Sequence, residues 1–543
     1  MKQAFLPGAM LRDRLSALLK NNECKALLLF FALLLLLGAM SYRDFGLGID
    51  EIRNRDFGIA NYNYVLNGGE FPGYFESHER THGPVFEVAL VLAEKGLGLK
   101  EEEHREIFLM RHFMTYLLFC AGVFFFYLLC KRLFGDWRAA LLGCLFLAIN
   151  PRVFAHAFFN SVDIAFTVFF IASIYTMLKF IGGANTKWAG IHALACALLI
   201  GVRVVGAIVP VFTVLFFAPE FFRKGEKKWR LAGALVLFAG LAALFSFLFW
   251  PFLWANPAEN LLAAFTETTD DPLSTKMLYL GSYIDSRNAP WHFTPVWMLV
   301  TIPLLYIALF AAGLAALAAG FVSRRAKRFI GRRESSLVLL WLFLPIAMSV
   351  ALASTMFNEW RHFFFVWPAF VIIALSGLLG LLALAQKLLG ENRKKAVLVA
   401  AALLVFLGLL EPALFMAQWY PHYYVYFNAL AGKDMQEAGQ NFDLDYWGIS
   451  YRQGWEYLLR NMHGDIKADV ASGGGTVNLH ILSIRDRSRI YCDSVNGSAG
   501  FFISTHYGYE GGYPYEEYHS IMVGNAKILS IYRVEAEPIS RPS

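Results

Sequence analysis

Blocks of about twenty apolar residues, separated by short polar and often basic runs, dominate the chain. An α-helix of about 20 apolar residues crosses the hydrocarbon core of a bilayer, which is about 30 Å thick. Only helices and closed barrels satisfy their backbone polar groups inside lipid. The pattern therefore predicts an α-helical, polytopic membrane protein.

The lengths of the blocks predict how often each one crosses. The block 137–181 would form a helix about 67 Å long, roughly twice the core thickness, and cations flank both of its ends, so we expect a hairpin. The same reasoning predicts a hairpin for 188–222. The blocks expected to cross once are 26–40, 108–134, 231–254, 294–322, 336–353, 363–385 and 396–419.

These crossings add up to about eleven transmembrane helices. Lys and Arg gather in alternate connections, as they do on the cytoplasmic side of a membrane. We therefore expect a multi-pass protein of the plasma membrane, the inner membrane in bacteria, with a cytoplasmic amino terminus and a periplasmic or extracytoplasmic carboxyl terminus. The first block is short enough to suit a signal peptide, but it lacks a clear A-x-A site, which favours an uncleaved anchor.

Composition agrees with this class and excludes others. Apolar residues make up 57% of the chain and charged residues 17%, against roughly 45–50% and 25% in ordinary soluble domains. A disordered chain and a soluble multidomain enzyme are both excluded. The net charge of +6 follows from the cytoplasmic connections and does not indicate nucleic-acid binding.

The polar segments predict two domains, a transmembrane domain at 1–418 and a soluble extracytoplasmic C-terminal domain at 419–543. Within the first we expect a large outer loop with a surface helix at 84–99, a second outer loop and a long third one. These three outer loops are 41–107, 150–163 and 255–293. The second domain is expected to be a small α+β unit with a helix at 451–462, strands at 467–471, 488–493, 500–505 and 526–534, an aromatic membrane-interface belt at 419–427 and a loop at 473–475.

Asp50 and Glu51 form an acidic pair about ten residues beyond the first block. A carboxylate there could act as general base on an acceptor hydroxyl, or the pair could hold a divalent cation. A solvated pair in an acidic loop is the simpler alternative. Because most unexplained polar residues fall outside, where nucleotide sugars and ATP are absent, a reaction there needs a membrane-carried donor.

Several other residues are candidates for the same outer surface. His82 lies in a turn ending at Pro84, which suits either a helix start or a bend that aims the imidazole. Asp163 begins an inward span, where an acidic residue also complements the helix dipole. Arg203, Arg361 and His362 lie at the outer rim, where they either snorkel or bind a lipid phosphate.

Other kinds of chemistry lack a signature. The sequence has no H-E-x-x-H or C-x-x-C zinc spacing and no serine nucleophile elbow. No span carries a string of acidic residues, as many ion-coupled transporters do. Glu51 and Asp163 remain open as ligands of a divalent metal, and no other cofactor is indicated.

Together these segments resemble the GT-C glycosyltransferases, in particular bacterial members of the protein O-mannosyltransferase and lipid A aminoarabinose transferase group. The resemblance rests on Asp50-Glu51 after the first span and on motifs of matching order and spacing. These motifs are Thr81-His-Gly-Pro84, Lys131 to Gly135, Asn150 to Asp163, Arg361-His362 to Pro368, Pro421 to Gly432 and Phe442 to Gly448. His-Gly-Pro departs from the family's His-Pro-Pro, and Asp163 is followed by Ile.

The resemblance implies a GT-C fold and an inverting transfer of a hexose or pentose from a polyprenyl-phosphate donor to a hydroxyl of an envelope glycan, lipid or protein. Asp50 would be the catalytic base, and Arg203, Arg361 and His362 would stabilise the departing lipid phosphate. Glu51, His82 and Asp163 would orient the substrates, and Trp291 and His292 could cover the site. A flippase for lipid-linked sugars, another transporter and a non-catalytic membrane scaffold remain alternatives.

Overall fold

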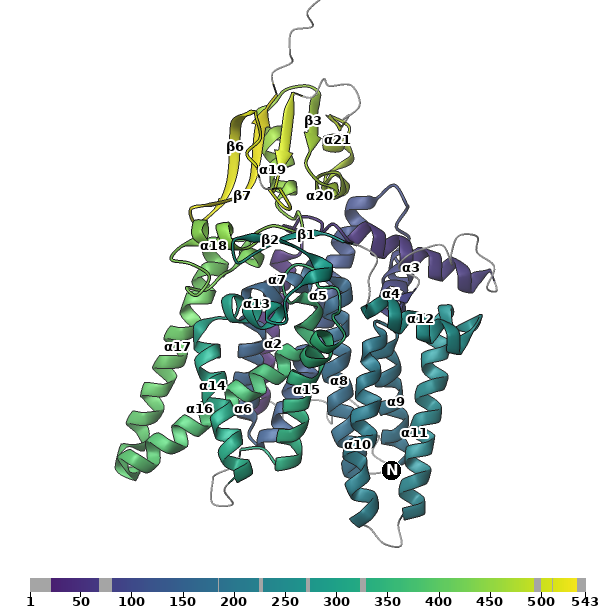
Figure 1. Cartoon of the computed structure of the whole chain (residues 1–543), viewed down its shortest axis with the longest axis vertical. Helices are drawn as coiled ribbons and strands as arrows, with labels where there is room; N and C mark the ends of the chain where they lie inside the picture. Colours follow the sequence, from purple (N-terminus) through teal and green to yellow (C-terminus); the bar gives the residue numbers. More distant parts are fainter. Residues whose placement is uncertain are drawn as a thin grey trace, which may run out of the picture.

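The computed structural model describes residues 21–67, 81–183, 185–223, 228–269, 274–322, 329–492, 500–509 and 511–534. The long helices form a body with most of its axes roughly parallel, and a sheet-containing domain sits on one end of it (Figure 1). The basic runs at 1–20, 224–227 and 323–328, on which the expected orientation partly rests, lie outside these residues, so the orientation stays a prediction.

Within the described part of the chain, eight helical segments are long and apolar enough to cross a membrane. They are α2 (Asn22–Ser41), α5 (His104–Phe134), α8 (Ser161–Gly183), α11 (Lys228–Phe249), α14 (Leu304–Val322), α15 (Arg332–Ala351), α16 (Trp367–Leu389) with the preceding η7 (Arg361–Val366), and α17 (Lys394–Gln418). The protein is therefore a multi-pass membrane protein, as its sequence predicts.

The three remaining expected spans correspond to shorter helices. These are α6 (Trp137–Ala148), α9 (Thr186–Ile200) and α10 (Ile208–Arg223). Helix α6 joins α7 (Pro151–Phe159) at a bend of 71°. Both expected hairpins therefore break where the sequence indicates, near residues 150 and 203, while the count of eleven spans stays a prediction.

Two segments differ from the sequence-based expectation. The expected loop 150–163 contains α7, all of whose residues are buried, because Asn150 caps the helix through Val153 N–H and Pro151 occupies its first position. The expected single helix 294–322 is broken into α13 (Phe293–Thr301) and α14, since Pro303 has no N–H to continue the ladder.

The first outer loop forms α3 (Glu51–Leu66) and α4 (Val85–Gly96), apart from 68–80, which lie outside the described residues. The expected helix at 84–99 is confirmed, but its charges are not solvated. Glu87 and Glu94 are buried and form ion pairs with Arg111 of α5, and Glu94 also pairs with Arg55 of α3. The end of the expected span 231–254 forms η5 (Pro251–Trp254). The third outer loop contains α12 (Pro257–Thr269), the antiparallel strands β1 (Lys276–Tyr279) and β2 (Ser282–Asp285), and η6 (Ser286–Asn288).

The C-terminal part carries a five-stranded sheet in the order β4-β3-β5-β7-β6. Its strands are β3 (Ile466–Val470), β4 (Ile490–Tyr491), β5 (Phe501–Ser504), β6 (Glu516–Val523) and β7 (Ala526–Arg533), with β3 parallel to β4 and β5 and the other pairs antiparallel. Helix α19 (Tyr451–Asn461) packs on the sheet through Tyr451, Trp455 and Leu458. The expected helix and four strands are confirmed, except that residue 493 is not described. The sequence analysis missed β6, and the expected loop at 473–475 begins the short helix α20 (Gly473–Val477).

The aromatic run after α17 does not form the expected membrane-interface belt. Tyr423, Tyr424, Tyr426 and Phe427 are all at most 7% exposed and pack into the core of the helical body, partly against α7. The prediction was wrong because long-range packing, which a local aromatic pattern does not reveal, covers these rings. The division into domains at residue 418 stays a prediction.

Candidate active site

Four charged side chains from four separate segments meet in one place, here called the charge cluster. Asp50 precedes α3, Asp163 lies in the first turn of α8, Arg203 precedes η3 (Val204–Ala207) and Arg361 begins η7. Arg361 Nη1 lies 3.4 Å from Asp50 Oδ2 and 3.7 Å from Asp163 Oδ2, while Arg203 Nη2 lies 2.7 Å from Asp163 Oδ1. The sequence analysis named all four residues, and the structure brings them together.

The charge cluster is partly open to solvent. The side chains of Asp50, Arg361 and Arg203 are 15–18% exposed, whereas that of Asp163 is 3% exposed. Within the described residues, Nε of both Arg203 and Arg361 is buried without a hydrogen-bond partner. Buried donors are usually paired, so these arginines have hydrogen-bonding capacity left for an anion.

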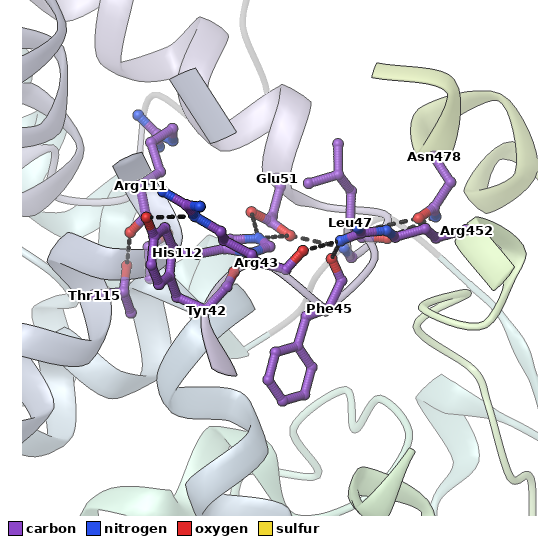
Figure 2. Close-up of polar contacts among 12 residues, drawn as sticks. Tyr42, Arg43, Phe45, Leu47, Glu51, Arg111, His112, Thr115, Arg452 and Asn478 are labelled. Atoms are coloured by element: carbon purple, nitrogen blue, oxygen red, sulfur yellow. Dashed lines mark hydrogen bonds and ion pairs between the residues drawn. The ribbon is translucent and has the colours of Figure 1, made fainter. Parts of the chain in front are cut away.

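Glu51 points to a different partner from its neighbour. Its carboxylate lies 3.0 and 3.2 Å from His112 Nε2 of α5 and accepts a 2.8 Å bond from Gly48 N–H (Figure 2). Glu51 is 5% exposed, and across the described residues its carboxylate and that of Asp50 share no hydrogen-bond partner. The expected role of Glu51 in binding the donor stays a prediction, and its contacts fix the start of α3.

The turn that carries His82 packs against the segment before Arg203. Gly83 N–H donates to Val202 O over 3.1 Å and Val85 N–H to Gly201 O over 3.0 Å. A Cβ on Gly83 would lie 2.1 Å from the carbonyl carbon of Gly201, so the two backbones meet closely. His362 lies where the charges of Arg203, Arg361 and His82 act on it, which puts both expected histidines beside the charge cluster.

Trp291 and His292, which were expected to cover the site, contact each other, and His292 also contacts Tyr279. Trp291 is 70% exposed, and its ring meets that of His292 edge to face. His292 Nδ1 lies 2.7 Å from the hydroxyl of the buried Tyr279 in β1. A covering role for Trp291 and His292 therefore stays a prediction.

The side chains present do not fit a metal ion. Among the described residues, no three His, Cys, Asp or Glu side chains converge as a metal site requires. Asp163 is engaged by Arg203 and by Asn160 Nδ2, and Glu51 by His112. Two carboxylates whose oxygens are already engaged by protein side chains are poor metal ligands, so the described side chains here do not form a metal site.

A buried polar network that the sequence analysis did not assign a role extends from Asp163 toward the C-terminal part. Asn160 Nδ2 donates to Asp163 Oδ2 over 2.8 Å and lies 3.0 Å from His156 Nδ1. Glu359 Oε2 lies 3.6 Å from His156 Nε2 and 3.2 Å from Arg152 Nη1, and it accepts a 2.8 Å bond from Tyr446 O–H. The sequence did carry a signal for this network, because Arg152 and His156 are polar residues inside an apolar hairpin.

Trp447 joins the C-terminal part to the charge cluster directly. Its ring centroid lies 4.7 Å from Cζ of Arg361, which is a cation–π distance, and the residue is 2% exposed. His156 packs edge to face on the same ring at 5.5 Å. Trp447 was part of a motif that carried the resemblance, but its contact with Arg361 spans 86 positions and could not be seen in the sequence.

Asp443 links its own segment to those of Leu278 and Asn358. Its Oδ2 accepts bonds from Leu278 N–H at 2.8 Å and from Asn358 Nδ2 at 2.6 Å. Burial raises the pKa of Asp443 to about 7, because these two bonds and one from the backbone of Gly508 offset only part of the cost of burying the charged form. This carboxyl therefore changes its charge near neutral pH.

Comparison with known proteins gives a partial family match and two structural neighbours. Residues 107–250 match the model of the family described as dolichyl-phosphate-mannose-protein mannosyltransferase. The oligosaccharyltransferase AglB from Archaeoglobus fulgidus, solved with an inhibitory peptide and a dolichol-phosphate, aligns at a TM-score of 0.50 with 12% identity over 88% of this chain and 69% of its own.

That match shows the fold. The chain has the GT-C fold. ArnT from Cupriavidus metallidurans, crystallised with undecaprenyl phosphate, is also similar, with 14% identity, a TM-score of 0.49 and coverage of 93% of this chain and 97% of its own. No curated protein matches the sequence.

The GT-C resemblance that the sequence motifs suggested is confirmed, and the findings support a membrane glycosyltransferase. The matched region of the family model begins within α5 and ends just after α11. It therefore contains Asp163 and Arg203 of the charge cluster but neither Asp50 nor Arg361. Asp50 and Arg361 are therefore assigned to the site by their distances in this structure and not by the family match.

Proposed function

We propose that the protein transfers a hexose or pentose from a polyprenyl-phosphate donor to a hydroxyl group on the extracytoplasmic face of the membrane, with inversion at the anomeric carbon. The acceptor would be an envelope glycan, a lipid or a protein. The partial family match supports a lipid-phosphate donor, and the solved GT-C neighbours were crystallised with or bound to undecaprenyl phosphate and dolichol-phosphate. Substrate lipids would reach the site from the membrane itself.

The charge cluster carries this proposal. A single arginine, Arg361, lies near two carboxylates from separate segments, and its Nη1 is within 3.7 Å of both. A phosphate near this position would compete with the carboxylates for the guanidinium, which binds phosphate well through paired N–H groups. Displacement of Asp50 from Arg361 would leave Asp50 Oδ2 free to accept a proton.

In the proposed reaction, Asp50 accepts the proton of the acceptor hydroxyl as the oxygen attacks the anomeric carbon. The new carbon–oxygen bond forms on the face opposite the phosphate, and the bond from the anomeric carbon to the phosphate oxygen breaks. The electron pair leaves with the polyprenyl phosphate. Arg361 and Arg203, with His362 beside them, would stabilise the charge that develops on this leaving group.

The remaining residues would position these groups. Asp163 orients Arg203 through a 2.7 Å ion pair, and His82 lies in a turn that packs beside the same arginine. A partly buried ion pair of this kind fixes the guanidinium before the donor arrives, which lowers the cost of reorganisation during reaction. Trp291 and His292 would cover the substrates after these bind.

The test compares envelope glycans by mass spectrometry between a strain lacking the gene and the same strain carrying the wild-type gene. Loss of one sugar on deletion, with return on complementation, names the sugar and the acceptor. Sugar transfer is then assayed with detergent-solubilised protein, which separates no membrane compartments. A glycosyltransferase still converts the lipid-linked sugar to free polyprenyl phosphate and glycosylated acceptor, whereas a flippase or a scaffold forms no product.

A further inference from the structure

The backbone just before Asp50 is attached to the C-terminal part of the chain, more than 390 residues away in sequence. The attached stretch is residues 43–49, here called segment 43–49. The residues that bind it include Gln453, whose Nε2 donates to Asp44 O, and Trp447, Arg452 and Asn478, here called the clamp (Figure 2 shows Arg452 and Asn478). The three clamp residues are at most 8% exposed.

Asn478 binds one residue of this segment from both sides. Its Oδ1 accepts from Leu47 N–H at 2.8 Å, and its Nδ2 donates to Leu47 O at 2.9 Å. The same Nδ2 also lies 2.9 Å from Gly448 O and 2.8 Å from Gly474 O. One fully buried amide therefore joins the segment, the turn after Trp447 and the start of α20.

Arg452 and Trp447 extend the attachment in both directions. Arg452 Nη1 donates to Phe45 O at 2.8 Å and also to Arg43 O. At the other end, Ile49 N–H donates to Trp447 O at 3.1 Å. The backbones of residues 43, 45, 47 and 49 are thus bound to the C-terminal part, mostly by side chains of that part.

Two glycines allow this close approach. A Cβ on Gly46 would lie 2.1 Å from Ile449 O, and a Cβ on Gly48 would lie 2.5 Å from the ring of Trp447. Real Cβ atoms do not come so near, so any side chain at either position would push the segment away from the clamp. The sequence Phe-Gly-Leu-Gly at 45–48 is therefore fitted to this surface.

Asp50 follows the last attached residue directly, and its other neighbour is fixed as well. Glu51, next along the chain, is tied to His112 Nε2 at 3.0 Å and to Gly48 N–H at 2.8 Å. The backbone is therefore held on both sides of Asp50, while the Asp50 side chain remains partly exposed. The same Trp447 that accepts from Ile49 also packs on Arg361.

We propose that the C-terminal domain is a structural part of the active site, in which Asn478, Arg452 and Trp447 are positioning residues that set Asp50 and Arg361 relative to each other. This inference rests on the proposed role of Asp50 as base. It gives the C-terminal domain a role besides any binding of substrate, because binding alone does not require the domain to fix the loop that carries the base. Loss of the Asn478 or Arg452 bonds to segment 43–49 should lower the rate of transfer and leave binding of the lipid phosphate nearly unchanged, because neither residue contacts Arg361 as Trp447 does.

The test uses full-length protein in nanodiscs and three variants, Asn478→Ala, Arg452→Met and Arg489→Ala. Arg489 donates to three backbone carbonyls inside the C-terminal domain and has no contact with segment 43–49, so its variant controls for loss of domain stability. Amide hydrogen exchange of residues 43–50 reports release of the segment. Native mass spectrometry with undecaprenyl phosphate reports lipid-phosphate binding, and sugar transfer is measured in the deletion strain at matched membrane levels.

We expect Asn478→Ala and Arg452→Met to raise exchange at residues 43–50, to lower sugar transfer at least tenfold and to leave undecaprenyl phosphate binding within twofold of wild type. Arg489→Ala should leave exchange in that segment unchanged. Its sugar transfer should fall only in proportion to any loss of folded protein. If Asn478→Ala does not fold, Arg452→Met decides alone, because it keeps the apolar stem of the arginine. It loses the bonds to Phe45 and Arg43 and one partly exposed ion pair with Glu456 in the same helix.

The inference is overturned if exchange rises without a loss of transfer, if exchange does not rise at all, or if lipid-phosphate binding falls as much as transfer. Asp50→Asn, assayed in parallel, separates this failure from failure of the proposed function. A fully active Asp50→Asn contradicts the role of Asp50 itself, whereas an inactive Asp50→Asn with fully active clamp variants contradicts the clamp alone.

Discussion

Cζ of Arg361 lies 4.7 Å from the ring centroid of Trp447, although the two residues are far apart in sequence and belong to different parts of the fold. The indole fixes the position of a guanidinium that also faces Asp50 and Asp163. A cation held in this way loses less side-chain freedom when it binds an anion, which favours phosphate binding at the charge cluster.

Replacement of the indole should therefore weaken binding of undecaprenyl phosphate. A partly buried cation–π contact contributes roughly 0.5–2 kcal/mol, which predicts a loss of about 2- to 30-fold for Trp447→Ala and a smaller loss for Trp447→Phe. Titration followed by native mass spectrometry measures this. Trp229→Ala, at an 87% exposed position in α11, is the control. Equal affinity of Trp447→Ala and wild type would contradict the contribution of the stack.

The shape of the guanidinium should matter as well as its charge. Arg361→Lys keeps a positive charge but loses the planar pair of N–H donors that suits phosphate, so we expect roughly 10-fold less sugar transfer, and a larger loss for Arg361→Gln. Arg138→Gln, which removes an exposed arginine from α6, should transfer as wild type. If lysine fully replaces Arg361, bidentate phosphate binding at this position is wrong.

Glu51 and His112 should contribute mainly to stability. Glu51→Ala leaves the buried His112 ring without its carboxylate partner, which costs about 1–3 kcal/mol in free energy of unfolding, whereas Glu51→Gln keeps an amide oxygen for Gly48 N–H and His112. Thermal unfolding should thus order the variants as wild type, Gln, Ala. A drop of more than tenfold in undecaprenyl phosphate binding by the folded Gln variant would instead support the donor-binding role expected from the sequence.

Asp443 predicts a pH dependence of stability. Burial raises its pKa in the folded state to about 7, from 3.8 in an unperturbed carboxyl. Well below pH 3.8 the carboxyl is protonated in both the folded and the unfolded state. As pH rises from 4 through 7, the unfolded state releases its proton first, so stability is lost, by up to about 4 kcal/mol.

The measurement is thermal unfolding in nanodiscs between pH 4.5 and 8 for wild type and Asp443→Asn. Asparagine does not titrate, so the wild type should lose stability relative to this variant as pH increases, most of it below pH 7. Asp465→Asn, at an exposed position, should follow the wild-type curve. A constant difference between wild type and Asp443→Asn would show that Asp443 keeps one protonation state over this range.

Local patterns predicted most of the fold. Runs of apolar residues and flanking cations located the long helices, and the breaks near Asn150 and Arg203 followed from segments too long to cross once. Asp50, Asp163, Arg203 and Arg361 were found because charged residues at outer helix ends stand out against apolar surroundings. The pattern could not show which of these charges meet, because that depends on packing between helices.

The misses share one physical cause, which is long-range burial. Glu87 and Glu94 suggested a solvated helix face, yet Arg111 and Arg55 neutralise them inside the protein. The tyrosines at 423–426 suggested a lipid interface, yet they pack on α7. Likewise, nothing near Leu47 in the sequence indicates its contact with Asn478. The two hydrogen bonds that join the Leu47 backbone to the Asn478 side chain span 431 residues.

The most direct measurement of the central claim is the amount of sugar restored by Asp50→Asn in the deletion strain, relative to wild type at matched membrane levels. Asp56→Asn, at an exposed position six residues further along in α3, is the matched control. Asparagine is nearly isosteric with aspartate but cannot accept the acceptor proton, so we expect at least a 100-fold loss for Asp50→Asn, within the range for a lost general base, and full transfer for Asp56→Asn. Full restoration by Asp50→Asn would show that Asp50 is not the base and would contradict the proposed mechanism.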